Sequence, residues 1–284
     1  MQSTLGAPAA TRQRQRHYLM CRPTHFAVEY AINPWMDPSQ PVDTALAVTQ
    51  WEALTEAYRQ LGYTVDLIDP LPGLPDMVFA ANGAFVMDGR VYGAQFRNPQ
   101  RADEGPAYRA WFEAAGYPVQ VPKYVNEGEG DFLLVDSPVG ELVLAGTGFR
   151  TELGAHAEVQ DAFGRPVITL RLVDPRYYHL DTAMFPLSGG PARPANIAYY
   201  PEAFSEGSRK VLEQLYPNAI IASEADAAVL GLNAVSDGRH VVLNAEAERL
   251  AGQLEDRGYV PVRVNLSELR KAGGGPKCCT LEIR

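Results

Sequence analysis

The sequence predicts a single α/β domain with pseudo-fivefold symmetry, built from repeated units that close into a ring. Short polar residues open apolar, strand-like runs at intervals of 45 to 52 residues, and the order strand, hairpin, helix, strand recurs between them. The recurring positions are Asn33, Asn82, Asp131, Asp181, Asn233 and Cys278. Repeats of this length are typical of propellers and solenoids, in which each unit buries its apolar face against its neighbours. We therefore expect five of them to line one central channel: Asn33, Asn82, Asp131, Asp181 and Cys278.

Local signals justify each element of the unit. Apolar runs at 85–96 and 234–243 each contain an Asp-Gly pair, at 88–89 and 237–238, which is typical of a β-hairpin turn. Asn and Asp are common in turns, so they would also recur simply because hairpins recur. This alternative explanation does not account for the cysteine at the last repeat position, Cys278.

Helices and further strands follow the hairpins. The stretches 43–61 and 245–257 have helical character, and a glycine follows each of them closely, at 62 and 258. The β-branched runs 63–69 and 259–266 come next and are of the kind that occupies a central strand. Because the first and last units are incomplete, we expect the two ends of the chain to meet. Residues 17–284 are predicted to form the domain, and residues 1–16, with basic Arg12, Arg14 and Arg16, a flexible arm.

Composition limits the classes of function. The 284 residues carry a net charge of -9, so no basic surface is expected to hold nucleic acid, and a small molecule is the expected partner. No apolar stretch has the length of a membrane span. An odd number of cysteines, 3, does not suit a disulfide framework, which favours a reducing, cytoplasmic location.

The C-terminal segment 273–282 offers a candidate nucleophile. Three glycines and a proline permit close approach of a ligand and deliver Cys278 to the start of a final strand. A cysteine there is either an inert core residue or a nucleophile, and a neighbouring cation would favour its thiolate. Cys279 would face the opposite side of the strand, so we assign it to the core.

Among the 5 histidines, His179 is the candidate proton carrier. Asp181 follows it by two residues, which places the acid on the same face of an extended segment. His156 lies in the predicted helix 152–163 and is expected to be exposed.

Acidic residues gather in two further segments. Asp76 and Asn82 lie at the two ends of an apolar run, and Glu127, Glu129 and Asp131 alternate with glycines. The spacing fits neither a calcium loop nor a zinc site, so no metal is expected. Several carboxylates opposite a thiol and a histidine suit a planar cation such as a guanidinium, which they bind through paired hydrogen bonds.

These motifs, in this order, resemble the guanidine-modifying (amidinotransferase, or pentein) superfamily, which includes arginine deiminase, dimethylarginine dimethylaminohydrolase and arginine dihydrolase. The resemblance extends from Asn33 to Thr280 and rests on 75–82, 127–131, 179–182 and 273–280. It implies a five-bladed α/β propeller of ββαβ modules, in agreement with the repeat. It also implies a hydrolase that needs no cofactor.

The resemblance implies a role for each matching residue. Cys278 would be the nucleophile and His179 the general acid and base. Glu129 and Asp76 would hold the guanidinium, with Glu127 as a substitute for Glu129. Asp181 would occupy the position of an acid found in arginine deiminases. Arg101 and Arg150 would bind the substrate's α-carboxylate.

Two amides decide between activities. Asn82 stands where a carboxylate is usual in deiminases and dimethylargininases, and an amide can hold a neutral ureido group as well as a guanidinium. Asn33 and Asn82 resemble the asparagines of arginine dihydrolases, so our first reading is conversion of arginine to ornithine, carbon dioxide and ammonia. The alternative is a dimethylarginine dimethylaminohydrolase. Amidino transfer to an amine and a non-catalytic ring-shaped binding protein are the competing classes, and a homo-oligomer is left open.

Overall fold

The computed structural model describes residues 16–137, 140–187 and 195–284, and in this part of the chain the strands form five three-stranded sheets. The strand orders are β15 (Leu281–Glu282), β1 (His17–Cys21), β2 (Thr64–Ile68); β3 (Ala84–Met87), β4 (Arg90–Gly93), β5 (Val119–Gln120); β6 (Phe132–Ser137), β7 (Gly140–Thr147), β8 (Val167–Arg171); β9 (Met184–Leu187), β10 (Asn196–Tyr199), β11 (Ile220–Ile221); and β12 (Val235–Ser236), β13 (His240–Asn244), β14 (Val260–Val264).

Every sheet has the same connectivity. Its first and middle strands pair antiparallel, and its middle and third strands pair parallel across an intervening helix. The connecting helices are α1 (Thr44–Gln60), α2 (Glu104–Ala114), α3 (Leu153–Phe163), α5 (Glu206–Leu215) and α7 (Glu248–Asp256). Three short helices complete the described set: α4 (Leu180–Ala183), α6 (Glu224–Ala227) and α8 (Ser267–Arg270). The predicted α/β class and the fivefold repeat of strand, strand, helix, strand are therefore confirmed.

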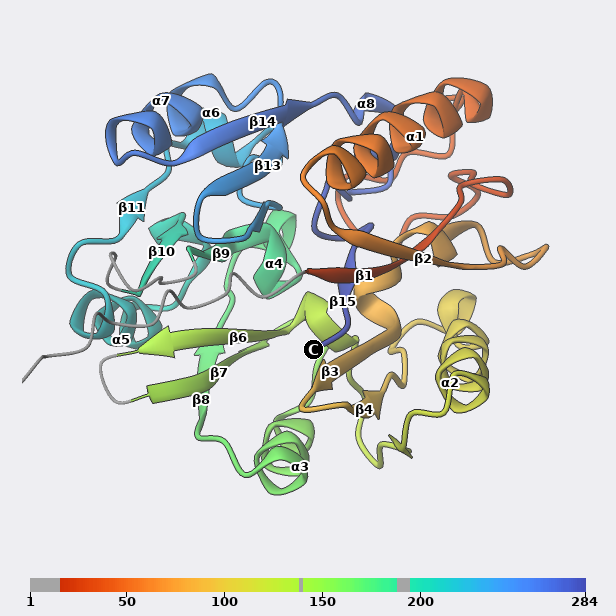
Figure 1. The fold of residues 1–284 in the computed structure, drawn as a ribbon, viewed down its shortest axis with the longest axis horizontal. Coiled ribbons are helices and arrows are strands. Elements are labelled where there is room, and N and C mark those ends of the chain that lie inside the picture. The colour runs from red at the N-terminus through yellow and green to blue at the C-terminus, as the bar shows by residue number, and fades with distance from the viewer. Residues whose placement is uncertain (1–15, 138–139, 188–194) are drawn as a thin grey trace, which may run out of the picture.

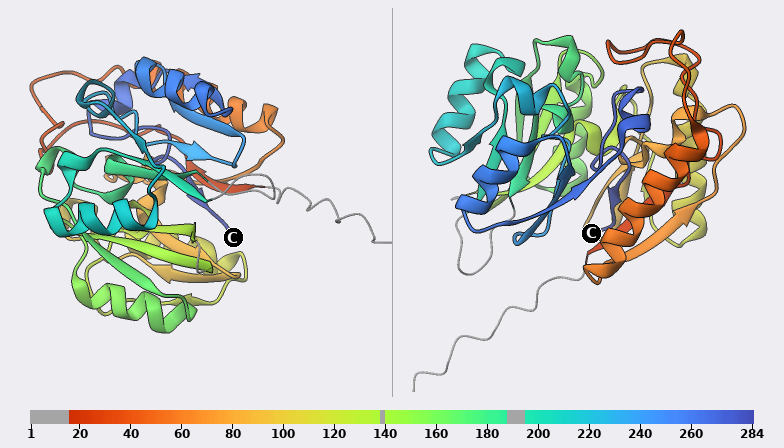
Figure 2. Two further views of the ribbon diagram at one scale, coloured as in Figure 1. Left: turned by 90° about the vertical axis from the view of Figure 1, so that its left-hand side faces the viewer. Right: turned by 90° about the horizontal axis from the view of Figure 1, so that it is seen from above.

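The two ends of the described chain meet in one sheet, as predicted. Strand β15 pairs antiparallel with β1, with Tyr18 opposite Glu282 and Leu19 opposite Leu281. Figure 1 shows the five sheets following one another around a common centre, and Figure 2 shows the long helices on the outside. Contacts of β9 with both β6 and β12, and of β15 with β3, join neighbouring sheets along their first strands.

The helices begin and end close to the predicted residues. Helix α1 begins after Asp43, whose side chain accepts a hydrogen bond from the Leu46 amide at 2.9 Å, and it ends before Gly62, which has a φ of +81°. It buries Trp51 and Leu54 against the sheet. Helix α7 begins later than predicted, because the Asn244 carbonyl and side chain hold the preceding residues in a turn.

The hairpin between β3 and β4 confirms the turn prediction. Asp88 and Gly89 have φ values of +52° and +69°, the left-handed pair that a two-residue hairpin turn requires. By contrast, the prediction that 63–69 and 259–266 form central strands is wrong. Strands β2 and β14 lie at sheet edges, with Leu67 48% and Val260 43% exposed. The helical crossover carries the third strand of each unit to the outside of its sheet, where β-branched residues pack on one face only.

The fold brings five repeat positions together. Asn82, Asp131, Asp181, Asn233 and Cys278 each lie one to three residues before the first strand of a sheet, and all five are buried. Asn33 departs from this pattern, because it lies in the loop between β1 and α1 rather than before an inner strand. In the sheet of β15, β1 and β2, the repeat position is Cys278.

Of the predicted N-terminal arm, residues 1–15 lie outside the described residues. Arg16 forms an ion pair with Glu282 and is half-buried. None of the helices described is both long and apolar enough to pass through a bilayer.

Candidate active site

Cys278 lies in a turn just before β15, where Asn233 holds it from two sides. The Asn233 side-chain oxygen accepts hydrogen bonds from the backbone amides of Gly275 and Cys278, at 3.0 and 2.9 Å. Its Nδ2 group donates to the Cys278 sulfur at 3.1 Å. The glycine loop can pack here because it lacks side chains: a Cβ on Gly274 would lie 2.1 Å from the Phe79 ring.

The thiol of Cys278 is buried and held in its neutral form. Burial, and next the negative charge of Asp181, raise its pKa well above the usual value. The thiol donates to Asp181 Oδ2 at 3.3 Å. Burial likewise raises the pKa of Asp181, to about 6, although His179 and Lys277 oppose this. A cation bound beside these groups would favour both the thiolate and the carboxylate.

His179 precedes α4 and pairs with Glu127 in the interior. Its Nε2 atom lies 2.7 Å from Glu127 Oε2, and Arg150 Nη1 donates to the same oxygen at 2.8 Å. Burial alone would raise the pKa of Glu127, but Arg150 and His179 lower it well below its usual range. Glu127 is thus a fixed negative charge that can stabilise a protonated His179.

Glu129, expected to hold the guanidinium, is not part of this cluster. It accepts hydrogen bonds from Lys277 Nζ and Arg284 Nη1, each at 2.5 Å, and from the Glu282 amide at 2.9 Å. The 3₁₀ turn Gly128–Gly130 sends Glu127 and Glu129 to opposite sides. Gly128 has a φ of +53°, and a Cβ there would meet the Ala84 carbonyl oxygen at 2.5 Å. The alternative, Glu127, therefore replaces Glu129 at the candidate site.

Unpartnered polar atoms cluster around these residues. Within the described chain, buried side-chain atoms without a hydrogen-bond partner include Asp76 Oδ1, Asp131 Oδ2, Asp181 Oδ1 and His179 Nδ1. Burial raises the pKa of Asp76 and of Asp131. Buried acceptors are normally satisfied, so the open oxygens of Asp76 and Asp181 indicate a site for a ligand with several N–H donors.

Arg101 and Asn82 form a second layer beside Asp76. Arg101 makes two hydrogen bonds to Glu104, at 2.9 and 2.7 Å, one to Asn82 Oδ1 at 2.8 Å and one to the Asp76 carbonyl at 3.2 Å. Four of its five N–H donors are thus engaged within the protein. Asn82 Nδ2 donates to the Glu127 carbonyl at 3.4 Å, so each end of the amide has one partner, and one N–H donor and one oxygen lone pair remain.

Arg150 and Asn33 connect the site to the loop between β1 and α1. Arg150 donates to the Ile32 carbonyl at 2.9 Å and stacks over the Tyr178 ring at 4.7 Å. Asn33 Nδ2 donates to the Ala272 carbonyl at 3.0 Å, next to the glycine loop. The loop between β1 and α1 therefore contacts the site through backbone and amide groups.

Two other sequence expectations have different outcomes. Cys279 is fully buried in an apolar cluster, which confirms its assignment to the core. The expectation that His156 is exposed is wrong: it is 5% exposed, with Nδ1 2.9 Å from Thr169 Oγ1 and Nε2 3.1 Å from the Gly146 carbonyl. Helix α3 turns this residue toward β7 and β8.

Sequence reasoning missed the roles of Asn233 and Glu104. Asn233 was recognisable as a repeat position but not as the residue that holds the Cys278 loop. Glu104 follows Arg101 by three residues, a spacing that permits an ion pair on one helical face. In the described residues, no group of three or more His, Cys, Asp or Glu side chains is arranged to hold a metal ion.

Comparisons with known proteins show the family to which the chain belongs. No protein-family model matches the chain. The N(G),N(G)-dimethylarginine dimethylaminohydrolase of Mycobacterium tuberculosis is 52% identical over 279 residues, which cover 98% of this chain and 89% of that protein. The chain belongs to the guanidine-modifying superfamily. Within this superfamily it stands with the hydrolases that cleave C–N bonds of guanidino groups.

A second branch of the superfamily is also similar. The bifunctional arginine dihydrolase/ornithine cyclodeaminase ArgZ of Synechocystis is 38% identical over 270 residues, 93% of this chain but 37% of that longer protein. The substrate-bound crystal structure of the ArgZ N-terminal domain superposes with a TM-score of 0.88 and 37% identity, over 95% of this chain and 98% of that one. This chain thus corresponds to the N-terminal part of ArgZ.

Proposed function

We propose that this single domain, residues 17–284, is a five-bladed α/β propeller that hydrolyses the guanidino group of a methylated arginine, as a dimethylarginine dimethylaminohydrolase. The observation that carries the guanidino substrate is the open carboxylate oxygen of Asp181, whose other oxygen accepts from the Cys278 thiol, together with the open, buried oxygen of Asp76. A guanidinium is a planar cation with several N–H donors, so it can both hydrogen-bond to these buried acids and balance their negative charge. The 52% identity to a dimethylargininase over nearly the whole chain supports the methylated substrate.

The proposed reaction has two steps on one cysteine. The bound cation favours the Cys278 thiolate, which attacks the central guanidino carbon, and His179 protonates the departing dimethylamine. A covalent thiouronium remains. His179, oriented by Glu127, then removes a proton from water, which attacks the same carbon and releases citrulline and the free thiol. Dimethylarginine and one water thus give citrulline and dimethylamine.

Arginine dihydrolase activity, our first reading, is the second candidate. The observation that favours it is Asn82, which presents an amide beside Arg101 at the site. An amide can hold the uncharged ureido group of citrulline as well as a guanidinium, so a second cycle on the same cysteine is chemically possible. Arginine and two waters would then give ornithine, carbon dioxide and two ammonia. The 38% identity to ArgZ supports this candidate less strongly than the 52% identity supports the first.

One experiment separates the candidates. Purified protein is incubated separately with asymmetric dimethylarginine and with L-arginine, and citrulline, ornithine, dimethylamine and ammonia are quantified. Citrulline and dimethylamine in equal amounts, without ornithine, support the dimethylargininase. Ornithine with two ammonia per arginine instead supports the dihydrolase. No product from either substrate, with a Cys278→Ser variant as the blank, would reject guanidino hydrolysis and revive the non-catalytic class.

A further inference from the structure

The sulfur of Cys278 has a second polar neighbour besides Asp181, the side chain of Asn233. Asn233 is fully buried just before β12, and its Nδ2 group donates to the sulfur at 3.1 Å. In the proposed reaction this sulfur carries negative charge twice, first as the attacking thiolate and later as the group that leaves the covalent intermediate. A donor fixed on the sulfur can therefore contribute to the chemistry as well as to the fold.

The surrounding hydrogen bonds determine which end of the Asn233 amide faces the sulfur. The backbone amides of Gly275 and Cys278 approach one end at 3.0 and 2.9 Å, and because they can only donate, this end must be the oxygen. The other end lies 3.0 Å from the Asp181 carbonyl oxygen, which can only accept, so it must be the nitrogen. The remaining N–H is available to the sulfur, so Cys278 meets a donor whether its thiol is protonated or ionised.

The amide is also held in place through the backbone. The Asn233 N–H donates to the Leu230 carbonyl at 3.1 Å, and the Asn233 carbonyl accepts from the Lys277 amide at 3.2 Å. A Cβ on Gly275 would lie 3.0 Å from Asn233 Oδ1, so the glycine loop packs directly against the side-chain amide. A donor that is already oriented needs no reorganisation when charge develops on the atom that it faces.

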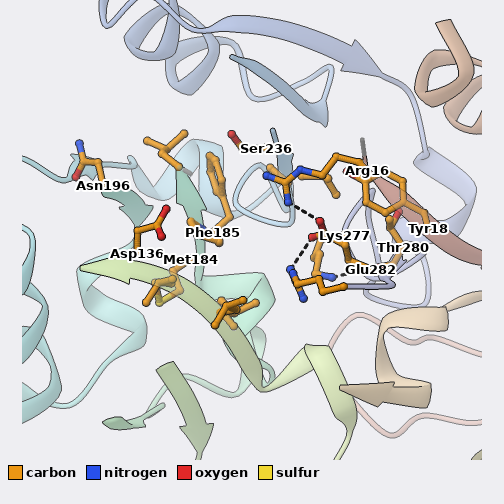
Figure 3. A pocket seen from close by; sticks show the side chains of 18 of the residues that line it. Arg16, Tyr18, Asp136, Met184, Phe185, Asn196, Ser236, Lys277, Thr280 and Glu282 are labelled. Atoms are coloured by element: carbon orange, nitrogen blue, oxygen red, sulfur yellow. Dashed lines mark hydrogen bonds and ion pairs between the residues drawn. The ribbon is translucent and has the colours of Figure 1, made fainter. Parts of the chain in front are cut away.

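The cation next to the nucleophile in the chain, Lys277, is directed elsewhere. Its Nζ donates to Glu129 at 2.5 Å and to the Thr280 carbonyl at 2.8 Å. Figure 3 shows its side chain beside Thr280, in a cavity whose lining residues do not include Cys278. The charge of Lys277 is therefore balanced by Glu129, away from the sulfur.

The contact with Asn233 becomes stronger as the sulfur gains negative charge. A thiol accepts hydrogen bonds weakly, whereas hydrogen bonds to an ionised acceptor are about twice as strong as neutral ones. Asp181 Oδ2, the other neighbour, accepts from the thiol at 3.3 Å, and an ionised Asp181 disfavours the thiolate. Of these two neighbours, Asn233 is the one that stabilises the anionic form.

The two steps of the reaction use this hydrogen bond differently. A contact accelerates a step only where it is stronger in the transition state than in the state before it. During attack the bound thiolate loses charge as the S–C bond forms, so the contact weakens. During hydrolysis the water oxygen forms the new C–O bond, His179 takes the water proton, and the C–S bond breaks with its electron pair returning to the sulfur. The contact then strengthens, and a better stabilised thiolate leaves faster.

We propose that Asn233 is a catalytic residue whose Nδ2 group donates to the Cys278 sulfur as the C–S bond of the covalent intermediate breaks. The residue stabilises the leaving thiolate in addition to holding the loop that carries it. This inference rests on the proposed function, because it requires the covalent thiouronium. It holds for either guanidino substrate, since both pass through a bond to the same sulfur.

Accumulation of the covalent intermediate is the test. The full chain is mixed with asymmetric dimethylarginine, or with L-arginine if that is the substrate that the wild type uses, and samples are quenched with acid at successive times. Intact-protein mass spectrometry measures the fraction of chains that carry the adduct, and the products are quantified in parallel.

Two variants remove the donor in different ways. Asn233→Asp retains an oxygen acceptor for the backbone amides of Gly275 and Cys278 but offers the sulfur no N–H. Asn233→Ala removes the whole amide and introduces no charge. Each should lower kcat about 10- to 100-fold, as expected for a lost hydrogen bond to a charged group, with most chains carrying the adduct in the steady state. A residue that only positioned the loop would slow the attack instead, and no adduct would accumulate.

Asn244→Asp is the matched control, because it makes the same chemical change in a buried amide elsewhere in the fold. Asn244 Nδ2 donates to the Val229 carbonyl at 2.9 Å, and its Oδ1 accepts from the Glu246 amide at 3.2 Å. This variant should keep the wild-type kcat and the wild-type level of adduct. Thermal unfolding verifies that each variant is folded, and either Asn233 variant alone provides the decision if the other is not.

Two results would overturn the role of Asn233 while the proposed function stands. They are a wild-type kcat in the Asn233 variants, and a lowered kcat without adduct above the wild-type level, each with a wild type that turns over. A wild type that forms no product from either substrate would instead reject guanidino hydrolysis and this role together.

Discussion

His179 and Glu127 form a buried pair in which Nε2 of the imidazole lies 2.7 Å from Oε2 of the carboxylate. Both side chains are almost fully inaccessible to solvent. Since Nε2 is engaged by Glu127, the unpartnered Nδ1 atom is the one left to exchange a proton with substrate or water. Glu127 therefore fixes the ring orientation and stabilises its protonated form, the role that a carboxylate performs beside a catalytic histidine.

Replacing Glu127 by glutamine should lower kcat about 100- to 10,000-fold, because the amide cannot stabilise the imidazolium. Glu129→Gln is the matched control from the same turn. Glu129 pairs with Lys277 and Arg284, so its loss should cost about 3–5 kcal/mol of stability while the folded fraction keeps its turnover. Steady-state kinetics and urea unfolding of both variants provide the measurement. A larger kcat loss in Glu129→Gln than in Glu127→Gln would restore Glu129 as the catalytic carboxylate.

Chloroacetamidine should label Cys278 alone among the three cysteines. Cys21 and Cys279 are fully buried away from the polar cluster, whereas Cys278 contacts Asp181 and Asn233. Burial raises the pKa of Cys278, so its thiol is protonated at pH 7.5 until a cation arrives. The neutral isostere chloroacetamide lacks the positive charge, so it should react with Cys278 at least roughly tenfold more slowly than chloroacetamidine. Mass spectrometry of peptides after timed labelling gives both the site and the rates. Equal rates for the two reagents would contradict cation assistance.

The stability of the protein should reveal the raised pKa of Asp181. Because that pKa is about 6 when folded and about 3.9 when unfolded, the folded state binds the extra proton between these values. The carboxylate therefore destabilises the fold above pH 6, and this cost disappears as the pH falls below 4. Relative to wild type, Asp181→Asn should gain about 2–3 kcal/mol between pH 4 and pH 7, and it should lose activity.

Urea unfolding across this pH range measures the effect, with Asp237→Asn as the control of opposite sign. Burial would raise the pKa of Asp237, but hydrogen bonds from Tyr63, His240 and backbone amides lower it. The ionised Asp237 thus stabilises the fold at neutral pH, and this stabilisation is lost in acid. Relative to wild type, Asp237→Asn should therefore become less stable as the pH rises. A pH-independent difference for Asp181→Asn would show that Asp181 titrates normally in the folded protein.

The repeat of polar residues predicted the architecture because each marks the same structural event, the entry into the first strand of a sheet. Asn82, Asp131 and Asp181 each precede such a strand, and the packing of five sheets brings them together. Asn33 has the right spacing but lies in a connecting loop, which shows that period alone cannot identify equivalent positions. Residue type and order within the motifs identified Cys278 and His179.

The choice between Glu127 and Glu129 could not be made in the same way. Both are flanked by glycine, and the backbone conformation of Gly128 decides which carboxylate meets His179. The sequence also could not predict that β2 is an edge strand, because β-branched residues suit edge and central strands alike. His156 was predicted to be exposed, because the sequence does not show which strands pack against its helix and therefore which helical face is buried. These features depend on contacts between distant segments.

The glycine loop offers a last test, of the dependence of the nucleophile on backbone packing. A Cβ on Gly274 would lie 2.1 Å from Phe79 Cε1, and Phe79 is buried and packs against Phe26, so it has little room to move. Gly274→Ala should cost about 1–3 kcal/mol and displace the segment that Asn233 holds, lowering kcat more than it changes KM.

Gly207→Ala provides the control, since this glycine lies in α5 with nothing within 4 Å of the added Cβ. It should stabilise the protein by about 0.5–1 kcal/mol with unchanged kinetics, because alanine restricts the unfolded chain and favours the helix. Thermal unfolding and steady-state kinetics are compared for both variants. If Gly274→Ala retains full kcat, Cys278 does not depend on the tight packing of the loop on Phe79, and its position must be set by the Asn233 hydrogen bonds alone.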